Sequence, residues 1–357
     1  MPAPTPVIHT WLLPLSGLYG LVVRGRNLLF DRGLLHEQSF PFPVICVGNL
    51  TVGGTGKTPH TEYLLRLLKG HQAAVLSRGY GRKTHGYLLA SPESSAQDIG
   101  DEPWQIYQKF PDVSVAVDEK RVEGIQNLMH EIHPEVIVLD DAYQHRYIKA
   151  GLNILLTDYH RLMTRDWLMP AGRLREPLKG KRRANLIIIT KCPTLTTPEM
   201  QQLRKEMDLS PNQKLYFSQI RYAEPAPVFQ APPEGWKGKN ILLIAGIATP
   251  QPLLEEVQKH TDHVEFIEFQ DHHQFTQSDL LKVAQKLSEM GPDTILLTTE
   301  KDAARLKTIE TRLSDSLRQR LYRLPIEVEI HSDQDNDFNE QILTFVEKFD
   351  TSCKEQK

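Results

Sequence analysis

A glycine-rich segment at residues 51–58 constrains the fold of this chain more than any other feature. Residues 44–47 before it are apolar and rich in β-branched side chains, which predicts a buried parallel strand. Pro59 opens an amphipathic stretch that ends near Gly70, which predicts a helix. A strand, a glycine-rich turn and a helix in this order cradle phosphate groups, because backbone N–H groups and the helix N-terminus face one point. The chain is therefore predicted to contain a phosphate-binding loop.

The residues of this loop nearly match the pattern G-x-x-x-x-G-K-[ST]. Thr51 stands where the pattern has its first glycine, so a glycine-rich turn with an incidental lysine is the alternative interpretation. The strand before the loop and the helix after it favour phosphate binding. Lys57 can reach the β- and γ-phosphates of a nucleotide, and the Thr58 hydroxyl can ligate Mg²⁺. The predicted nucleotide-binding residues are Thr51, Val52, Gly53, Gly54, Thr55, Gly56, Lys57 and Thr58.

A pair of carboxylates follows another apolar run. Residues 136–139 are Val-Ile-Val-Leu, and Asp140 and Asp141 come directly after them. A strand of this kind delivers an acid to the mouth of a parallel sheet, where it can hold Mg²⁺ beside a nucleotide. Adjacent acids in an ordinary loop are the alternative. The phosphate loop upstream favours a role for both acids in holding the metal and positioning phosphate.

The composition bounds the classes of protein that the chain can belong to. Its 357 residues are 40% hydrophobic and 24% charged, which is typical of a globular protein large enough for two domains. The formal net charge of −3 argues against general nucleic-acid binding. Three widely spaced cysteines suit a reducing compartment and offer no cysteine zinc site. We expect no signal peptide and no spanning helix, since no run approaches about 18 uninterrupted apolar residues.

The order of apolar runs predicts the domain organisation. Strand-like runs alternate with helical stretches up to about residue 190, which indicates a doubly wound parallel sheet. Four prolines between residues 225 and 233 mark a boundary, and a second α/β unit begins near residue 241. We predict an α/β fold of the P-loop NTPase type with a second, smaller α/β domain. The expected segments are an N-terminal membrane-interface helix region (1–35), a phosphate-loop domain (36–215), an extended linker (216–238) and the smaller domain (239–357).

The N-terminal region has a helical pattern with an aromatic and basic fringe. Trp11 and Tyr19 accompany many aliphatic residues, and Arg24 and Arg26 lie among them. One interpretation is an interfacial helix on an anionic membrane, with the arginines at the headgroups and the aromatic rings at headgroup depth. The other is a helix packed on the domain core with solvated arginines. The residues alone leave both interpretations open.

Two basic loops are candidates for holding an anionic substrate. Arg78 and Tyr80 lie in a glycine-containing loop after the second predicted strand, at the edge where ligands bind in open α/β sheets. Residues 170–177 form a second loop, bounded by prolines, that contains Arg175 and Glu176. Ordinary solvated loops are the alternative for both segments.

Two further segments carry candidate acid–base groups. Asp101 precedes a predicted helix over residues 104–110, and its spacing favours an N-cap over a catalytic role. His272 lies in the sequence Asp-His-His at 271–273. That sequence allows a metal site, a polar loop, or an acid–base histidine brought to the cleft by the second domain.

Taken together, these motifs resemble the tetraacyldisaccharide 4'-kinase family. The matching segments keep the family's order from about residue 11 to about residue 305, and Thr51 is the family's own variant. Residues 142 and 143 are Ala-Tyr where Gly-Phe is commoner. The segments that carry the resemblance are residues 49–59, 77–81, 100–103, 140–145, 170–177, 271–272 and 299–302.

The resemblance implies a kinase that uses ATP and Mg²⁺. Its substrate would be tetraacyldisaccharide 1-phosphate, a lipid A precursor, phosphorylated on the 4'-hydroxyl to give lipid IVA. The protein would lie peripherally on the cytoplasmic face of the inner membrane, and nothing points to a nucleic-acid or an obligatory protein partner. Asp101 resembles the residue that accepts the hydroxyl proton, assisted by His272. The remaining implied site residues are Lys57, Asp140 and Asp141 for catalysis and Arg78, Tyr80, Gln144, His145, Arg175 and Glu176 for the substrate.

Two other functions fit parts of the sequence. Residues 189–191 resemble the start of a guanine-reading Thr-Lys-x-Asp, which would suit a GTPase-like nucleotide switch or metallochaperone. Pro193 stands where that motif needs its carboxylate, which argues against this alternative. A lipid-binding module without catalysis would have no use for a phosphate loop and paired acids.

Overall fold

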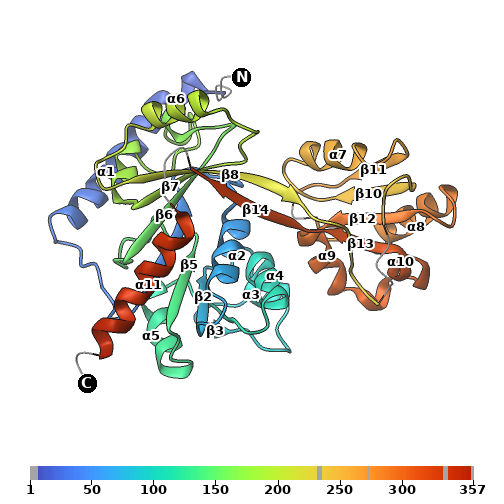
Figure 1. Ribbon diagram of the computed structural model, residues 1–357, viewed down its shortest axis with the longest axis horizontal. Helices are drawn as coiled ribbons and strands as arrows, with labels where there is room; N and C mark the ends of the chain where they lie inside the picture. Colours follow the sequence, from blue (N-terminus) through green and yellow to red (C-terminus); the bar gives the residue numbers. More distant parts are fainter. Residues whose placement is uncertain (1–6, 231–234, 272, 333–336, 355–357) are drawn as a thin grey trace.

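Two β-sheets organise the chain in the computed structural model, which describes residues 7–230, 235–271, 273–332 and 337–354. Figure 1 shows the large sheet and its helices on one side, the small sheet on the other, and β8 and β14 passing between them. The strand order is β14-β8-β7-β6-β1-β5-β2-β4-β3 in the large sheet and β11-β10-β12-β13-β9 in the small one. The predicted α/β fold with a second, smaller α/β unit is confirmed.

The elements around the large sheet come from both ends of the chain. Its strands are β1 (Val44–Asn49), β2 (Ala73–Ser77), β3 (Leu88–Leu89), β4 (Ser114–Val117), β5 (Val136–Asp140), β6 (Leu152–Asp158), β7 (Leu186–Thr190), β8 (Lys214–Tyr222) and β14 (Ile326–His331). Its helices are α1 (Leu13–Asp31), α2 (Lys57–Leu67), α3 (Ala96–Ile99), α4 (Asp101–Lys109), α5 (Arg121–Glu131), α6 (Thr197–Met207) and α11 (Phe338–Lys354), with short 3₁₀ turns η1 (Thr10–Leu12), η2 (Met163–Arg165) and η3 (Leu178–Arg183).

The small sheet is built from one continuous stretch of chain. Its strands are β9 (Ala226–Pro227), β10 (Ile241–Ala245), β11 (Val264–Glu268), β12 (Ile295–Thr299) and β13 (Leu321–Leu324). Its helices are α7 (Gln251–Gln258), α8 (Gln277–Glu289), α9 (Glu300–Lys307) and α10 (Asp315–Arg320), with the 3₁₀ turn η4 (Glu310–Arg312).

Strand β1 lies at the centre of the large sheet, and every one of its residues is buried. It pairs in parallel with β5 on one side and β6 on the other. Its alternate side chains enter two apolar clusters: Val44 and Cys46 pack with residues of α5 and α6, whereas Ile45 and Val47 pack with residues of α2, α4 and α11. Helices therefore cover both faces, and the carboxyl ends of the parallel strands are left as the edge where ligands can bind.

The structure moves two of the predicted domain boundaries. We expected residues 216–238 to be an extended linker, but β8 is a strand of the large sheet and its Tyr216 and Phe217 are among the largest fully buried side chains. We expected residues 239–357 to form the smaller domain, but β14 pairs antiparallel with β8 and α11 packs on the large sheet. The chain thus returns to the large unit after the small one, and a contact so distant in sequence leaves no local signal.

The tail helix α11 supplies buried residues to the large unit. Phe338, Ile342 and Val346 lie on one face of α11 and join the cluster that contains Ile45 and Val47 of β1. Tyr63 of α2 also donates a hydrogen bond of 2.7 Å from its hydroxyl to the Asn339 side chain. The residues that complete this core therefore come from the end of the chain.

Replacing Ile342 with alanine tests this assignment. The Ile342 side chain is fully buried, so Ile342→Ala should lower the free energy of unfolding by about 2–5 kcal/mol. Urea unfolding followed by circular dichroism measures the change. The matched control is Thr344→Ala on the exposed face of α11, which should change stability by no more than about 0.5 kcal/mol. Equal and small effects of the two substitutions would contradict the packing of α11 on the large sheet.

Candidate active site

The phosphate loop lies between β1 and α2 and is held by side chains from neighbouring strands. Asn49 at the end of β1 donates from Nδ2 to Thr55 Oγ1 over 2.8 Å. At the end of β7, Thr190 Oγ1 donates to Thr55 O over 2.9 Å and Lys191 Nζ donates to Gly54 O over 2.5 Å. These bonds occupy two carbonyl oxygens and one hydroxyl of the loop, which fixes its backbone without a ligand.

Backbone geometry explains the glycines in this loop. Gly53 has φ +110° and Gly56, the N-cap of α2, has φ +85°. L-residues with side chains rarely adopt these conformations, so both turns favour glycine. The His60 ring links Gly56 to strand β8: its Nδ1 lies 2.7 Å from Gly56 O, and its Nε2 lies 2.9 Å from Ser218 Oγ. Burial lowers the pKa of His60 to about 4, so the imidazole is neutral at pH 7 and donates to Gly56 O.

The two predicted carboxylates lie beside this loop. Asp140 ends β5, and its Cα partner across the parallel ladder is Val47 of β1. Its side chain is buried, and burial, followed by the charge of Asp141, raises the pKa of Asp140 to about 6. Asp141 lies 3.6 Å from Lys57 Nζ and 3.3 Å from Arg175 Nη1. The structure therefore brings Lys57, both acids and Arg175 together at the mouth of the sheet.

These groups fit a divalent cation that is shared with phosphate oxygens. Mg²⁺ in nucleotide sites takes one or two protein carboxylates and completes its coordination with phosphates and water. A buried carboxylate whose ionised form is disfavoured gains from a nearby cation, and Thr58 on the first turn of α2 offers a hydroxyl. Within residues 7–230, 235–271, 273–332 and 337–354, no cluster of three or more His, Cys, Asp or Glu could hold a metal unaided.

The loop after β5 and the loop at 170–177 contact each other next to Asp141. Gln144 donates from Nε2 to Asn49 O over 2.6 Å and accepts at Oε1 from Arg175 Nη1 over 3.2 Å. Glu176 is buried and paired with Arg183 at 2.7 Å. Gln144, Arg175 and Glu176, which the sequence named as candidates, therefore form one connected wall of the site.

Helix α1 is tied to the same wall by hydrogen bonds. Tyr19 OH donates to Arg175 O over 2.6 Å, and Asn27 Nδ2 donates to Glu176 Oε2 over 3.1 Å. Arg26 donates from both terminal nitrogens to Gln144 O, each over 3.2 Å. One face of the N-terminal helix is therefore part of the site, which its sequence pattern did not reveal.

A group of arginines surrounds His145. Burial, followed by the charges of Arg121, Arg26 and Arg78, lowers the pKa of His145 to about 4. Arg121 is buried at the start of α5 and donates from Nη1 to Asp118 O over 2.8 Å. Its Nε has no hydrogen-bond partner among the described residues. Sequence analysis did not select Arg121, although its place just after strand β4, at the ligand edge, could have identified it.

Asp101 lies beside the other candidate loop. It is the first residue of α4, and Gly100 is the N-cap, so the expectation that Asp101 caps this helix is wrong by one position. Gly100 has φ +93°, and a Cβ there would lie 3.1 Å from Gly79 Cα and 3.0 Å from Tyr80 O. Only glycine allows this contact, which sets the loop of Arg78 and Tyr80 against the start of α4. Both of those side chains are exposed at the mouth.

The second domain approaches Asp101 through α9. Arg305 of α9 lies 2.7 Å from Asp101 Oδ2. The predicted partner His272 lies outside the described residues. Its neighbour His273 is not placed as a free acid–base group, because its Nε2 lies 3.0 Å from Asp279 and its ring stacks on Phe269.

This arrangement defines a class of protein. A preformed phosphate loop, paired acids at the end of the adjacent strand and a cationic rim are the parts of a P-loop nucleotide-dependent phosphotransferase. The family model of tetraacyldisaccharide-1-P 4'-kinase matches residues 8–347. The chain therefore belongs to the tetraacyldisaccharide 4'-kinase family.

The similar proteins carry the same name. A tetraacyldisaccharide 4'-kinase of Bacteroides thetaiotaomicron is 49% identical over 356 residues, covering 95% of this chain and 93% of that protein. One from Bacteroides fragilis is 50% identical over 352 residues, with 95% and 93% covered. The crystal structure of LpxK from Aquifex aeolicus in complex with ATP superposes with a TM-score of 0.72 at 29% identity, covering 95% of this chain and 98% of that one. The alternative of a GTPase-like switch or metallochaperone is not supported.

Replacing Arg121 tests the electrostatics around His145. Arg121→Gln should raise the pKa of His145 from about 4 towards its ordinary value, because one nearby positive charge is removed. NMR titration of the imidazole nitrogens measures it, and Arg24→Gln, an exposed arginine of α1, is the matched control that should leave it unchanged.

The same shift sets a direction for stability. Between about pH 6.5 and about pH 4, the unfolded chain binds more protons than the folded one, because the pKa of His145 is lower in the folded chain. The contribution of neutral His145 to the free energy of unfolding is therefore complete above about pH 6.5 and is lost as the pH falls towards about 4. A titration midpoint that does not move in Arg121→Gln would contradict the placement of Arg121 beside this ring.

Proposed function

We propose that this chain transfers the γ-phosphate of ATP to the 4'-hydroxyl of tetraacyldisaccharide 1-phosphate, giving lipid IVA in lipid A biosynthesis. The observation that carries the proposal is the contact of Lys57 with the acid pair, 3.6 Å from Asp141, at a preformed phosphate loop. Phosphoryl transfer needs positioning and charge neutralisation more than covalent chemistry, and this arrangement supplies both.

On the nucleotide side, the proposal assigns the triphosphate to residues 51–58. N–H groups of the loop and of the start of α2 would face the phosphates, except those of Val52 and Thr55, which donate to Arg173 O and Gly53 O. Lys57 would exchange its contact with Asp141 for the β- and γ-phosphate oxygens. Thr58, Asp140 and Asp141 would hold Mg²⁺, which neutralises phosphate charge when bound. Arg175 then remains on Asp141 and keeps that carboxylate oriented.

On the acceptor side, we assign the proton of the 4'-hydroxyl to Asp101, the first residue of α4. The proposed help from His272 concerns a residue outside the described part of the chain. Arg78, Tyr80 and Arg175 would contact the sugar and its 1-phosphate, and His145 would do so as a neutral hydrogen-bonding ring. Gln144 and Glu176 would support these contacts through the wall that they form.

Replacing Lys57 tests the proposal on the nucleotide side. Lys57→Ala should lower kcat by about 10²-fold or more, because the charge that neutralises the transferring phosphoryl group is lost. Phosphorylation of tetraacyldisaccharide 1-phosphate by labelled ATP in mixed micelles measures it. Lys69→Ala, an exposed lysine beyond the end of the same helix, is the control. Near wild-type turnover by Lys57→Ala, or no turnover by the wild type, would overturn the proposed function.

We further propose that α1 holds the protein on the cytoplasmic face of the inner membrane, where its acylated substrate lies. Large apolar side chains are exposed along η1 and α1: Trp11 of η1 is 77% exposed, and Leu18 and Val22 of α1 are 64% and 66% exposed. A stripe of this size is unusual on a soluble surface and fits the boundary between headgroups and acyl chains. No helix in the described part of the chain is long and apolar enough to span a bilayer.

Two details of the expected membrane face need correction. Arg26 was expected at the headgroups, but it donates to Gln144 O and lies over the Phe30 ring. Tyr19 was expected at headgroup depth, but its hydroxyl bonds to Arg175 O. The contact with lipid is therefore assigned to the apolar stripe, and Arg24 is exposed beside it.

Charges placed in the stripe test the membrane proposal. Leu18→Glu with Val22→Glu should weaken binding to vesicles of phosphatidylethanolamine and phosphatidylglycerol by at least about tenfold. The reason is that two apolar side chains that would be buried in the membrane are replaced by charged ones. Co-flotation measures the bound fraction, and ATP binding in solution should stay unchanged. The matched control is Leu281→Glu on α8, an apolar residue that is 63% exposed. Wild-type flotation by the double variant would exclude this face.

A further inference from the structure

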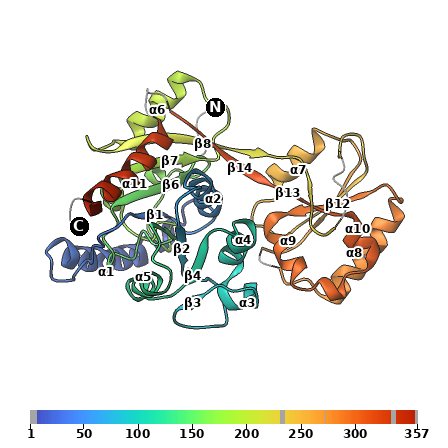
Figure 2. The same cartoon turned by 60° about the horizontal axis from the view of Figure 1, so that its bottom comes forward.

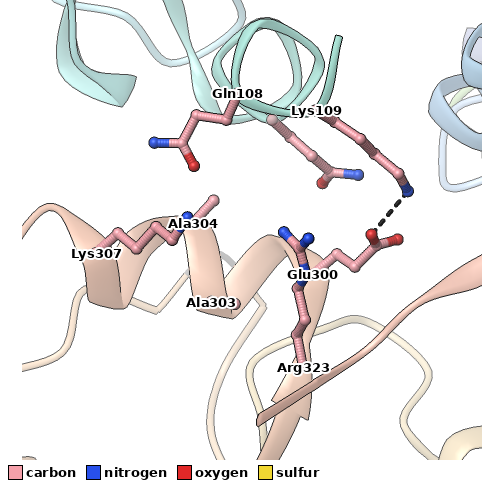
Figure 3. A pocket seen from close by; sticks show the side chains of 8 residues that line it. Gln108, Lys109, Glu300, Ala303, Ala304, Lys307 and Arg323 are labelled. Atoms are coloured by element: carbon pink, nitrogen blue, oxygen red, sulfur yellow. Dashed lines mark hydrogen bonds and ion pairs between the residues drawn. The ribbon is translucent and has the colours of Figure 1, made fainter. Parts of the chain in front are cut away.

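Helices α4 and α9 lie side by side and join the two units of the protein (Figures 1 and 2). Three ion pairs cross between them: Arg305 with Asp101 at 2.7 Å, Lys301 with Glu102 at 2.9 Å, and Glu300 with Lys109 at 2.7 Å. Figure 3 shows the last of these at one end of the contact. At the other end, the pair includes the residue assigned above to the proton of the acceptor hydroxyl.

Arg305 is held rigidly within its own unit. Its Nη1 donates to Asp302 Oδ1 over 2.8 Å and to Gly246 O over 3.3 Å. Asp302 is fully buried, and its Oδ2 accepts from Gly246 N over 2.9 Å and from Thr299 Oγ1 over 2.8 Å. These bonds fix the plane of the guanidinium, because a buried carboxylate with three donors has little freedom to turn.

The opposite edge of the same guanidinium reaches Asp101. Nε and Nη2 both donate to Asp101 Oδ2, over 3.0 Å and 2.7 Å. The side chain of Arg305 is 5% exposed and that of Asp101 is 16% exposed, so water screens this contact poorly. Two charge-assisted bonds to one oxygen set the orientation of the carboxylate.

Gly246, which accepts from Arg305, also contacts the segment that follows β11. A Cβ at Gly246 would lie 3.0 Å from Gln270 O and 3.3 Å from His273 Cβ, closer than side chains normally pack. The segment after β11 therefore packs on the glycine that also accepts from Arg305. Gly246 therefore contacts both the segment after β11 and the arginine that reaches the start of α4.

We propose that Arg305 is a positioning residue of the reaction, which holds the Asp101 carboxylate in the orientation that receives the proton of the acceptor hydroxyl only while the two units are in contact. This inference rests on the proposed function, since it assumes that Asp101 takes the proton. A displacement of about 1 Å in such a group can cost about 10²-fold in rate. The second unit thus contributes to catalysis through a charge that touches neither ATP nor the acceptor.

The test is a kinetic comparison of Arg305 variants in the full chain. Arg305→Gln should lower kcat by about 30- to 100-fold and change the KM for ATP by less than about threefold, because only proton acceptance is affected. Arg305→Lys keeps the charge near both carboxylates and should recover part of the loss. In an Asp101→Asn background, Arg305→Gln should have no further effect, because a residue that acts through Asp101 has nothing left to position.

Lys301→Gln is the matched control, because it breaks a neighbouring ion pair of α9 with α4 without touching Asp101. It should leave kcat within about twofold of wild type. Calorimetric titration with ATP and the unfolding temperature show whether each variant is folded. If Arg305→Gln is not folded, the kinetic comparison is made with Arg305→Lys.

The outcomes separate the inference from the function on which it rests. Equal kcat values for Arg305→Gln and Lys301→Gln, or equal losses from Arg305→Gln with and without Asp101→Asn, would overturn the positioning role. A higher kcat in Arg305→Gln would identify an inhibitory contact and also overturn it. Wild-type turnover by Asp101→Asn would instead overturn the assignment of the proton to Asp101.

Discussion

The structure depends on how the phosphate loop is anchored to the ends of β1 and β7. Thr55 is held by Asn49 of β1 and by Thr190 of β7, and Lys191 bonds to the carbonyl of Gly54. The carbonyl oxygens of Gly54 and Thr55 are engaged from the end of β7, and the N–H groups of Val52 and Thr55 donate to Arg173 O and Gly53 O, so the loop is already ordered without a ligand. Donors held in this way would need little reorganisation during phosphoryl transfer. The same sheet buries Asp140 beside them, and burial, followed by the charge of Asp141, raises the pKa of Asp140 to about 6. The position of the phosphate loop, the donors that hold it and the carboxylate of Asp140 thus all depend on one set of parallel strands.

Local patterns predicted the parts of the site that lie close together in sequence. The strand and helix around Lys57, and the apolar run before Asp140 and Asp141, are visible because periodicity and glycine positions report backbone shape. Contacts between distant segments were not predictable in this way. Arg305 meets Asp101 across 204 positions, and nothing near either residue records the other. The N-cap at Gly100 was missed for a different reason: its φ of +93° follows from contact with Gly79, not from the residues beside it.

Helix α1 shows why its two sequence interpretations could not be separated. An apolar stripe with Trp11 and Leu18 faces outward, while Tyr19, Arg26 and Asn27 hold the loops of the site. Packing and exposure therefore coexist on opposite faces of one helix, and the residues that looked most suited to a membrane are partly the ones turned inward. A helix with these two faces places the loops of the site about one helix diameter, about 10 Å, from whatever surface covers the stripe.

The antiparallel pairing of β8 with β14 has a consequence for how the molecule is made. Tyr222, where the chain leaves the large sheet, and Ile326, where it returns, face each other in that ladder. The small unit is thus an insertion at the tip of a hairpin, and a tight turn between those two positions would close the hairpin without it. During synthesis on the ribosome, β14 and α11 emerge after the inserted unit. The inserted unit can therefore fold before the large sheet receives this edge strand and its covering helix.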